Sequence, residues 1–102
     1  MPLSNPSATV LFPASNTATR INTAASTVSV LLAPANAARK GATIWNNSTS
    51  NLYIELGATP TTSSFSVKIS ADGYYELPFS YIGLINGIWD AANGSALLRE
   101  LT

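Results

Sequence analysis

Apolar side chains recur at every second residue through much of this chain, and this spacing limits its possible folds more than any other feature. The run Phe65-Ser66-Val67-Lys68-Ile69 shows the pattern most clearly. A period of two places successive side chains on opposite faces of an extended strand, whereas an amphipathic helix needs a period near 3.6. No segment shows a persuasive helical period. The sequence therefore predicts an all-β fold.

Turn-forming residues divide the alternating pattern into short strands. The predicted strands are 28–32, 42–46, 52–56, 65–69, 74–77, 84–89 and 96–101. Asp72-Gly73 and Asn93-Gly94 are dipeptides typical of tight turns. The polar cluster 46–51 is predicted to join its two flanking strands into a hairpin. About seven short antiparallel strands with regular turns are typical of a compact β-sandwich or barrel.

The first 25 residues have a different composition from the rest of the chain. Eighteen of them are Pro, Ala, Ser, Thr or Asn. Pro2, Pro6 and Pro13 disfavour helix, and the apolar side chains are too few to form a core. The sequence therefore predicts an extended N-terminal arm, 1–25, followed by a β-sandwich domain, 26–102.

The arm nevertheless contains small apolar islands, notably Leu11, Phe12 and Ile21. One interpretation is a flexible tail, as is common at chain ends. The other is an arm that becomes ordered on a partner protein, with these three residues as its anchors. The folded part that remains is small and has no cysteine, so oligomerisation is expected to contribute to its stability.

The charge of the chain excludes several classes of function. Charged residues make up 10% of the chain and the net charge is zero, whereas a typical globular domain is about 25% charged. Without clustered basic residues, nucleic-acid binding is not expected. No apolar run is long enough for a membrane helix, so no membrane association is expected. The weakly charged surface favours close packing against other proteins.

Catalytic chemistry has few candidate residues in this sequence. Histidine and cysteine are absent, which excludes Ser-His and Cys-His nucleophiles and thiolate metal sites. Glu55 and Glu76 are the one carboxylate pair that neighbouring strands might bring face to face, as glycosidases require. Two solvated strand residues are the simpler interpretation. We therefore expect a protein that is not an enzyme and that has no metal and no cofactor.

Trp45 and Tyr53 are the most informative candidate surface residues. If the flanking aliphatic residues point inward, both rings point outward on the same face of the predicted hairpin. Such a pair is typical of a protein interface, where Trp and Tyr dominate binding energy. Two other interpretations stay open: a Trp buried beneath a neighbouring loop, or a platform on which a glycan stacks beside Asn46, Asn47 and Asn51.

Four segments together resemble a known pattern. They are Arg39-x-x-x-x-Ile44-x-Asn46-x-Ser48, Leu52-Tyr53-Ile54-x-Leu56-Gly57, Tyr74-Tyr75-Glu76-Leu77-Pro78 and Tyr81-Ile82-Gly83-x-Ile85-x-Gly87-Ile88-Trp89. This pattern resembles small virion proteins of tailed bacteriophages, most of all the capsid cement (decoration) proteins of cyanobacterial siphophages. The resemblance covers residues 39–89, half of the chain.

The resemblance implies a structural role and supplies no catalytic residues. It implies a homotrimer on the outer surface of the capsid, made in the host cytoplasm and seated at local three-fold axes. Its N-terminal arms would clasp the major capsid protein and so bridge neighbouring capsid subunits. The alternatives are a head or tail appendage that binds host glycans, or another tail or neck subunit. A glycan-binding module has no use for an apolar N-terminal arm, which favours the cement protein.

Overall fold

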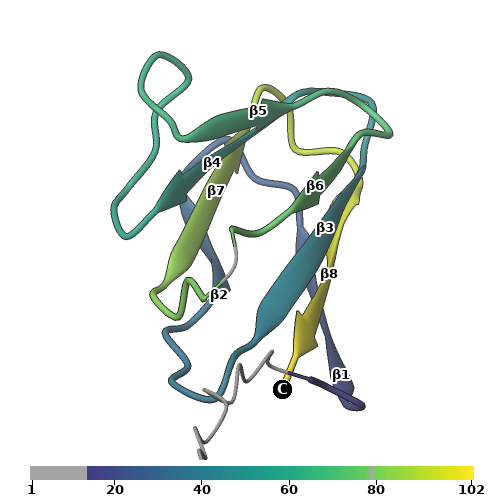
Figure 1. Cartoon of the computed structure of the whole chain (residues 1–102). Coiled ribbons are helices and arrows are strands. Elements are labelled where there is room, and N and C mark those ends of the chain that lie inside the picture. The colour runs from purple at the N-terminus through teal and green to yellow at the C-terminus, as the bar shows by residue number, and fades with distance from the viewer. Residues whose placement is uncertain (1–13, 79) are drawn as a thin grey trace, which may run out of the picture.

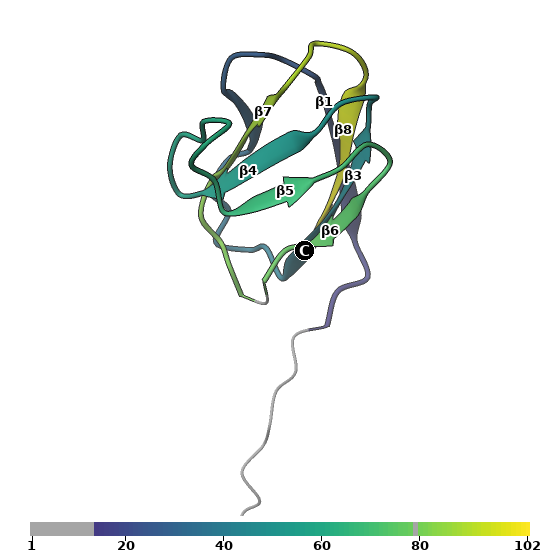
Figure 2. The ribbon, with the colours of Figure 1, turned by 90° about the horizontal axis from the view of Figure 1, so that it is seen from above.

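Eight strands and no helix form within residues 14–78 and 80–102, which are the residues that the computed structural model describes (Figure 1). The strands are β1 (Ala18–Ala24), β2 (Val30–Ala33), β3 (Gly41–Asn47), β4 (Leu52–Leu56), β5 (Val67–Ile69), β6 (Tyr74–Glu76), β7 (Ile85–Trp89) and β8 (Ser95–Leu101). They make two four-stranded antiparallel sheets that lie in separate layers (Figure 2). The prediction of an all-β antiparallel sandwich is confirmed.

The strand order explains why most strands that follow each other in the chain do not pair as hairpins. The first sheet has the order β1-β8-β3-β6 and the second has the order β2-β7-β4-β5. Among the described strands, only the β4–β5 connection stays within one sheet, and every other connection crosses to the opposite sheet. The predicted hairpin of 42–46 with 52–56 is therefore wrong, because β3 pairs with β6 and β8 while β4 pairs with β5 and β7.

The structure also corrects the boundary of the predicted arm. Residues 18–24 were expected to belong to the arm, but they form β1 and pair with β8 along its full length. Ile21 is half-buried and packs against the core of the domain itself. Most other side chains of β1 are exposed. An edge strand with one core-facing aliphatic residue leaves almost no alternating apolar pattern to detect.

The core lies between the two sheets and is made by the inward faces of their central strands. Its largest fully buried apolar side chains are Trp89, Leu32, Ile44, Leu52, Ile54, Ile85 and Leu98. Gly87 of β7 leaves room for the side chains of Leu32 and Leu52 from the two neighbouring strands of the same sheet, since a Cβ there would lie 2.9 Å from Leu32 Cδ1 and 3.0 Å from Leu52 Cδ1.

Candidate interaction face

Three large side chains form a row across the outer face of the first sheet. Ile44 and Asn46 of β3 point into the core, so Trp45 between them points outward. In the strand register, Trp45 is paired with Tyr74 of β6 on one side and with Leu97 of β8 on the other. Tyr74 is 54% exposed and Trp45 is 41% exposed, while Leu97 is half-buried. We call these three residues the aromatic row.

The charged strand residues next to the aromatic row lie on one side of it, and the exposed carboxylate of Asp72 lies beyond its other side. The adjacent register line runs from Glu76 of β6 through Thr43 to Arg99 of β8 and Arg20 of β1. The acid and the two bases thus occupy opposite edges of the face. The line on the other side of the row, through Asn47, Ser95 and Ala24, has no charge. An apolar row with sparse charges at its flank is suited to contact with another protein surface.

Tyr74 remains a neutral hydrogen-bonding group on this face. Partial desolvation raises the pKa of Tyr74, and the negative charge of the neighbouring Glu76 raises it further. The phenol therefore stays protonated at neutral pH. It can give a partner both apolar ring surface and one O–H donor, as aromatic residues at interfaces commonly do.

The structure does not place Tyr53 beside Trp45. Tyr53 belongs to β4 in the second sheet, whereas Trp45 belongs to β3 in the first. The Tyr53 ring is only 8% exposed and packs against Phe65, with the ring centroids 4.9 Å apart. Its hydroxyl donates to Asp90 Oδ2 at 3.1 Å. The residue buried under a neighbouring loop is therefore Tyr53 and not Trp45, and the shared platform predicted for the two does not form.

The three predicted anchors of the arm have separate outcomes. Leu11 and Phe12 lie outside the described residues. Ile21 packs against the core of its own domain, so it is not available as a third anchor for a partner. Ala14 is held on the domain by Lys40 Nζ, which donates to its carbonyl oxygen at 2.8 Å.

The carboxylates do not assemble into a catalytic pair. Glu55 lies on β4 and Glu76 on β6, in different sheets, so they do not face each other across neighbouring strands. Glu55 accepts a short hydrogen bond from Ser66 Oγ. Within residues 14–78 and 80–102, no three metal-ligating side chains of the His, Cys, Asp or Glu type come together. The same residues contain no helical segment with the length and hydropathy needed to span a bilayer.

Arg39, the first residue of the recognised pattern, is part of the buried framework. Its Nε donates to Glu100 Oε2 at 2.8 Å, and the guanidinium is fully buried. Nη1 donates to Gly83 O at 2.7 Å and Nη2 to Pro34 O at 2.6 Å. Asn36 Nδ2 donates to the second oxygen of Glu100 at 3.0 Å. The ion pair thus ties the loop after β2 and the loop before β7 to β8.

Asn46, the next polar residue of the pattern, joins two turns and β7 at the opposite end of the domain. Its Nδ2 donates to Ser50 O, Ile69 O and Ser70 O at 2.8, 2.9 and 3.1 Å. Its Oδ1 accepts from Ser48 Oγ at 2.7 Å and from Trp89 Nε1 at 3.2 Å. The sequence carries no signal of this network, because the residues around an Asn next to a turn do not indicate whether its side-chain amide is buried or exposed.

Comparison with family models, with curated proteins and with solved structures finds no match to this chain. Three polar residues that carry the resemblance, Arg39, Asn46 and Ser48, are buried and stabilise the loops of the sandwich. Tyr74, Glu76 and Ile82 of the same pattern are exposed. The function has to be argued from the exposed faces.

Proposed function

We propose that this protein is a non-catalytic structural component of a phage virion, a capsid cement protein that binds the major capsid protein and bridges its subunits. The observation that carries the proposal is the aromatic row, Tyr74, Trp45 and Leu97, on the outer face of the first sheet. Exposed Trp and Tyr at the centre of a sparsely charged face are typical of binding hot spots.

The size of this face indicates that one copy alone would bind weakly. Four strands about 4.8 Å apart and about seven residues long present at most about 400 Å². A stable interface buries about 800 Å² on each partner. A second contact is therefore needed, and we assign it to the arm, with Leu11 and Phe12 as the residues that bind the capsid.

Self-association would strengthen such modest contacts further. In a homotrimer, the first bound subunit raises the effective concentration of the other two at their sites, so the overall affinity greatly exceeds that of one contact. The small core, without disulfides, also favours an oligomer. Sedimentation equilibrium of the purified chain is expected to give a trimer.

A binding assay with purified phage heads lacking this protein tests the proposal. The double variant Trp45→Ser, Tyr74→Ser should bind heads about 1,000-fold more weakly, because two hot-spot side chains each contribute about 2 kcal/mol. Val28→Ser, which removes another exposed apolar residue outside the first sheet, is the matched control and should bind normally. Equal binding by the double variant and the control would refute a capsid contact through the aromatic row.

A further inference from the structure

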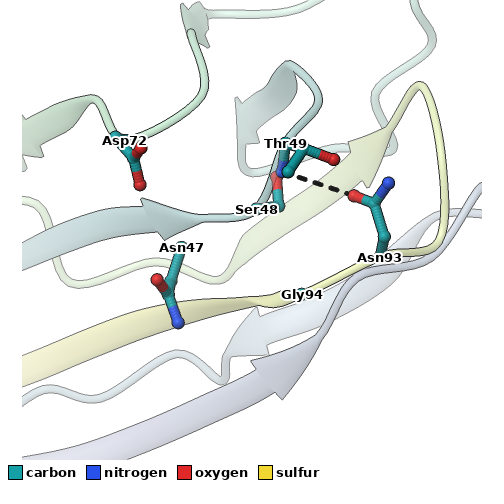
Figure 3. Close-up of a pocket in the computed structure, with 6 residues that line it drawn as sticks. All are labelled: Asn47, Ser48, Thr49, Asp72, Asn93 and Gly94. Carbon is teal, nitrogen blue, oxygen red and sulfur yellow. Dashed lines mark hydrogen bonds between the residues drawn. The ribbon is translucent and has the colours of Figure 1, made fainter.

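Three turns meet at one end of the sandwich and border a shallow, open hollow. They connect β3 to β4, β5 to β6 and β7 to β8. The hollow has a volume of about 210 Å³ (Figure 3). Its lining residues are Asn47, Ser48, Thr49, Asp72, Asn93 and Gly94. Figure 3 shows Thr49 and Asn93 joined by a hydrogen bond on one side, and Asp72 and Asn47 on the other side, where the Asn47 amide points away from Asp72. None of these lining residues belongs to the aromatic row.

The walls of the hollow are fixed by the backbone. Asp72 N donates to Asn46 O and Asn46 N donates to Gly73 O, each at 2.9 Å. Gly94 has a φ of 89°, and a Cβ there would lie 2.2 Å from Asn47 O, so only glycine allows this approach. A site held in place before a ligand arrives loses little conformational entropy on binding.

Several polar groups of the lining are not used by the protein itself. Asn93 Oδ1 accepts from Thr49 N at 3.4 Å, but Asn93 Nδ2 has no partner within the described part of the chain. Among the same residues, neither the Asn47 amide, the Thr49 hydroxyl nor the Asp72 carboxylate forms a side-chain hydrogen bond. The hollow thus offers both donors and acceptors, from two amides, a hydroxyl and a carboxylate.

This composition selects the kind of ligand. Asp72 is the one charged residue of the lining. Its negative charge disfavours phosphate and other anions, while a single carboxylate is too few for a calcium ion. The volume is below the roughly 300–1,000 Å³ of a pocket for a drug-sized molecule. A small neutral ligand rich in hydroxyl groups satisfies all of these conditions.

The hollow also adjoins the aromatic row. Asn47 lies two residues after Trp45 on the same face of β3, a distance of about 7 Å along the strand. Asp72 lies two residues before Tyr74, the register partner of Trp45. A pyranose has hydroxyl groups at its edge and C–H groups on its faces. We propose that the hollow binds the hydroxyl edge of one pyranose.

Amide NMR spectra of the full chain, titrated with sugars, test this proposal. The probes are the methyl glycosides of glucose, galactose, mannose, rhamnose and N-acetylglucosamine, each up to about 20 mM, since one sugar ring in a shallow site binds in the millimolar range. At least one glycoside is expected to shift the amide signals of Asn47, Thr49 and Asn93. Unchanged spectra with all five glycosides would overturn the proposal.

Two conservative variants assign the binding to the hollow. Asp72→Asn removes the charge but tolerates the φ of 58° at this position, and it should weaken binding about 10-fold or more. Thr49→Val removes the hydroxyl and keeps the shape, with an expected loss of about 3- to 10-fold. Asn86→Ala removes an amide elsewhere, one that donates to Ala58 O, and should bind normally. Equal affinity in all three variants would refute the site even if a sugar binds.

The same variants separate this inference from the proposed function. Asp72→Asn and Thr49→Val keep the aromatic row intact, so both should attach to phage heads as tightly as the unchanged protein. Loss of head attachment together with sugar binding would contradict an independent sugar site, because it would show that the hollow contacts the capsid.

Discussion

Replacing Asn46 with alanine should destabilise the domain more than any surface substitution. The change leaves Trp89 Nε1, a fully buried donor, without its hydrogen-bond partner. An unsatisfied buried donor costs about 1–3 kcal/mol. The amide bonds to Ser50 O, Ile69 O and Ser70 O are lost as well. Ser50 O keeps Ser48 Oγ, and Ser70 O keeps Gly73 N, so these losses add only about 1–2 kcal/mol.

The expected total is about 2–5 kcal/mol, a large part of the roughly 5–15 kcal/mol that stabilises a typical domain. Urea unfolding followed by tryptophan fluorescence measures it directly. Asn51→Ala is the matched control, because Asn51 makes an exposed bond to Asp90 and its loss should cost about 0.5 kcal/mol or less. If Asn46→Ala is no less stable than Asn51→Ala, the buried amide does not hold the two turns and β7 together.

Asn46→Asp gives an independent test of the same network through pH. A carboxylate at this position would face the carbonyl oxygens of Ser50 and Ile69, so the folded state disfavours the charged form and raises the pKa of the introduced acid. The stability penalty is therefore complete above that raised pKa and disappears as the pH falls through it, since the protonated acid can donate. A penalty independent of pH would contradict this assignment.

Three further outcomes follow from other parts of the structure. Arg39→Met leaves Glu100 buried without its partner and should cost about 3–5 kcal/mol in urea unfolding, whereas a cost below about 1 kcal/mol would show that the ion pair is dispensable. Gly87→Ala places a Cβ 2.9 Å from a core leucine methyl group and should lower stability by about 1–3 kcal/mol in thermal unfolding; an unchanged melting temperature would mean that the Leu32 side chain can move aside. Deleting residues 1–13 should keep the domain folded but weaken head binding, while deleting 1–25 also removes β1 and should unfold it. Tight head binding by the shorter deletion would refute the arm contact.

The sequence was sufficient to predict the architecture because the core strands alternate regularly. Seven of the eight strands overlap a predicted segment, and the chain turns at Asp72-Gly73 and Asn93-Gly94 as predicted, with positive φ values of 58° at Asp72 and 89° at Gly94. Pairing between strands was not predictable in the same way. A turn reverses the chain whether the next strand joins the same sheet or crosses the core, and both arrangements bury the same alternating face.

The candidate interaction face was predictable in part. Trp45 was correctly expected to point outward, because it lies between two residues with inward-pointing side chains. The prediction that Tyr53 lies beside Trp45 was wrong. Tyr74 lies beside Trp45, while Tyr53 is covered by Phe65. This error follows from the missed sheet crossing, since the predicted hairpin would have placed β4 next to β3. The polar hollow depends on three distant turns and has no local sequence signal.

The central claim is that this protein is a stoichiometric part of a phage head. Quantitative mass spectrometry of purified virions, with heads separated from tails, tests it most directly. The proposal predicts that the chain is found in the head fraction, in a fixed ratio to the major capsid protein, and that mild denaturant releases it before the shell dissociates. Its absence from heads, or its presence in a few copies on tails alone, would contradict the cement function.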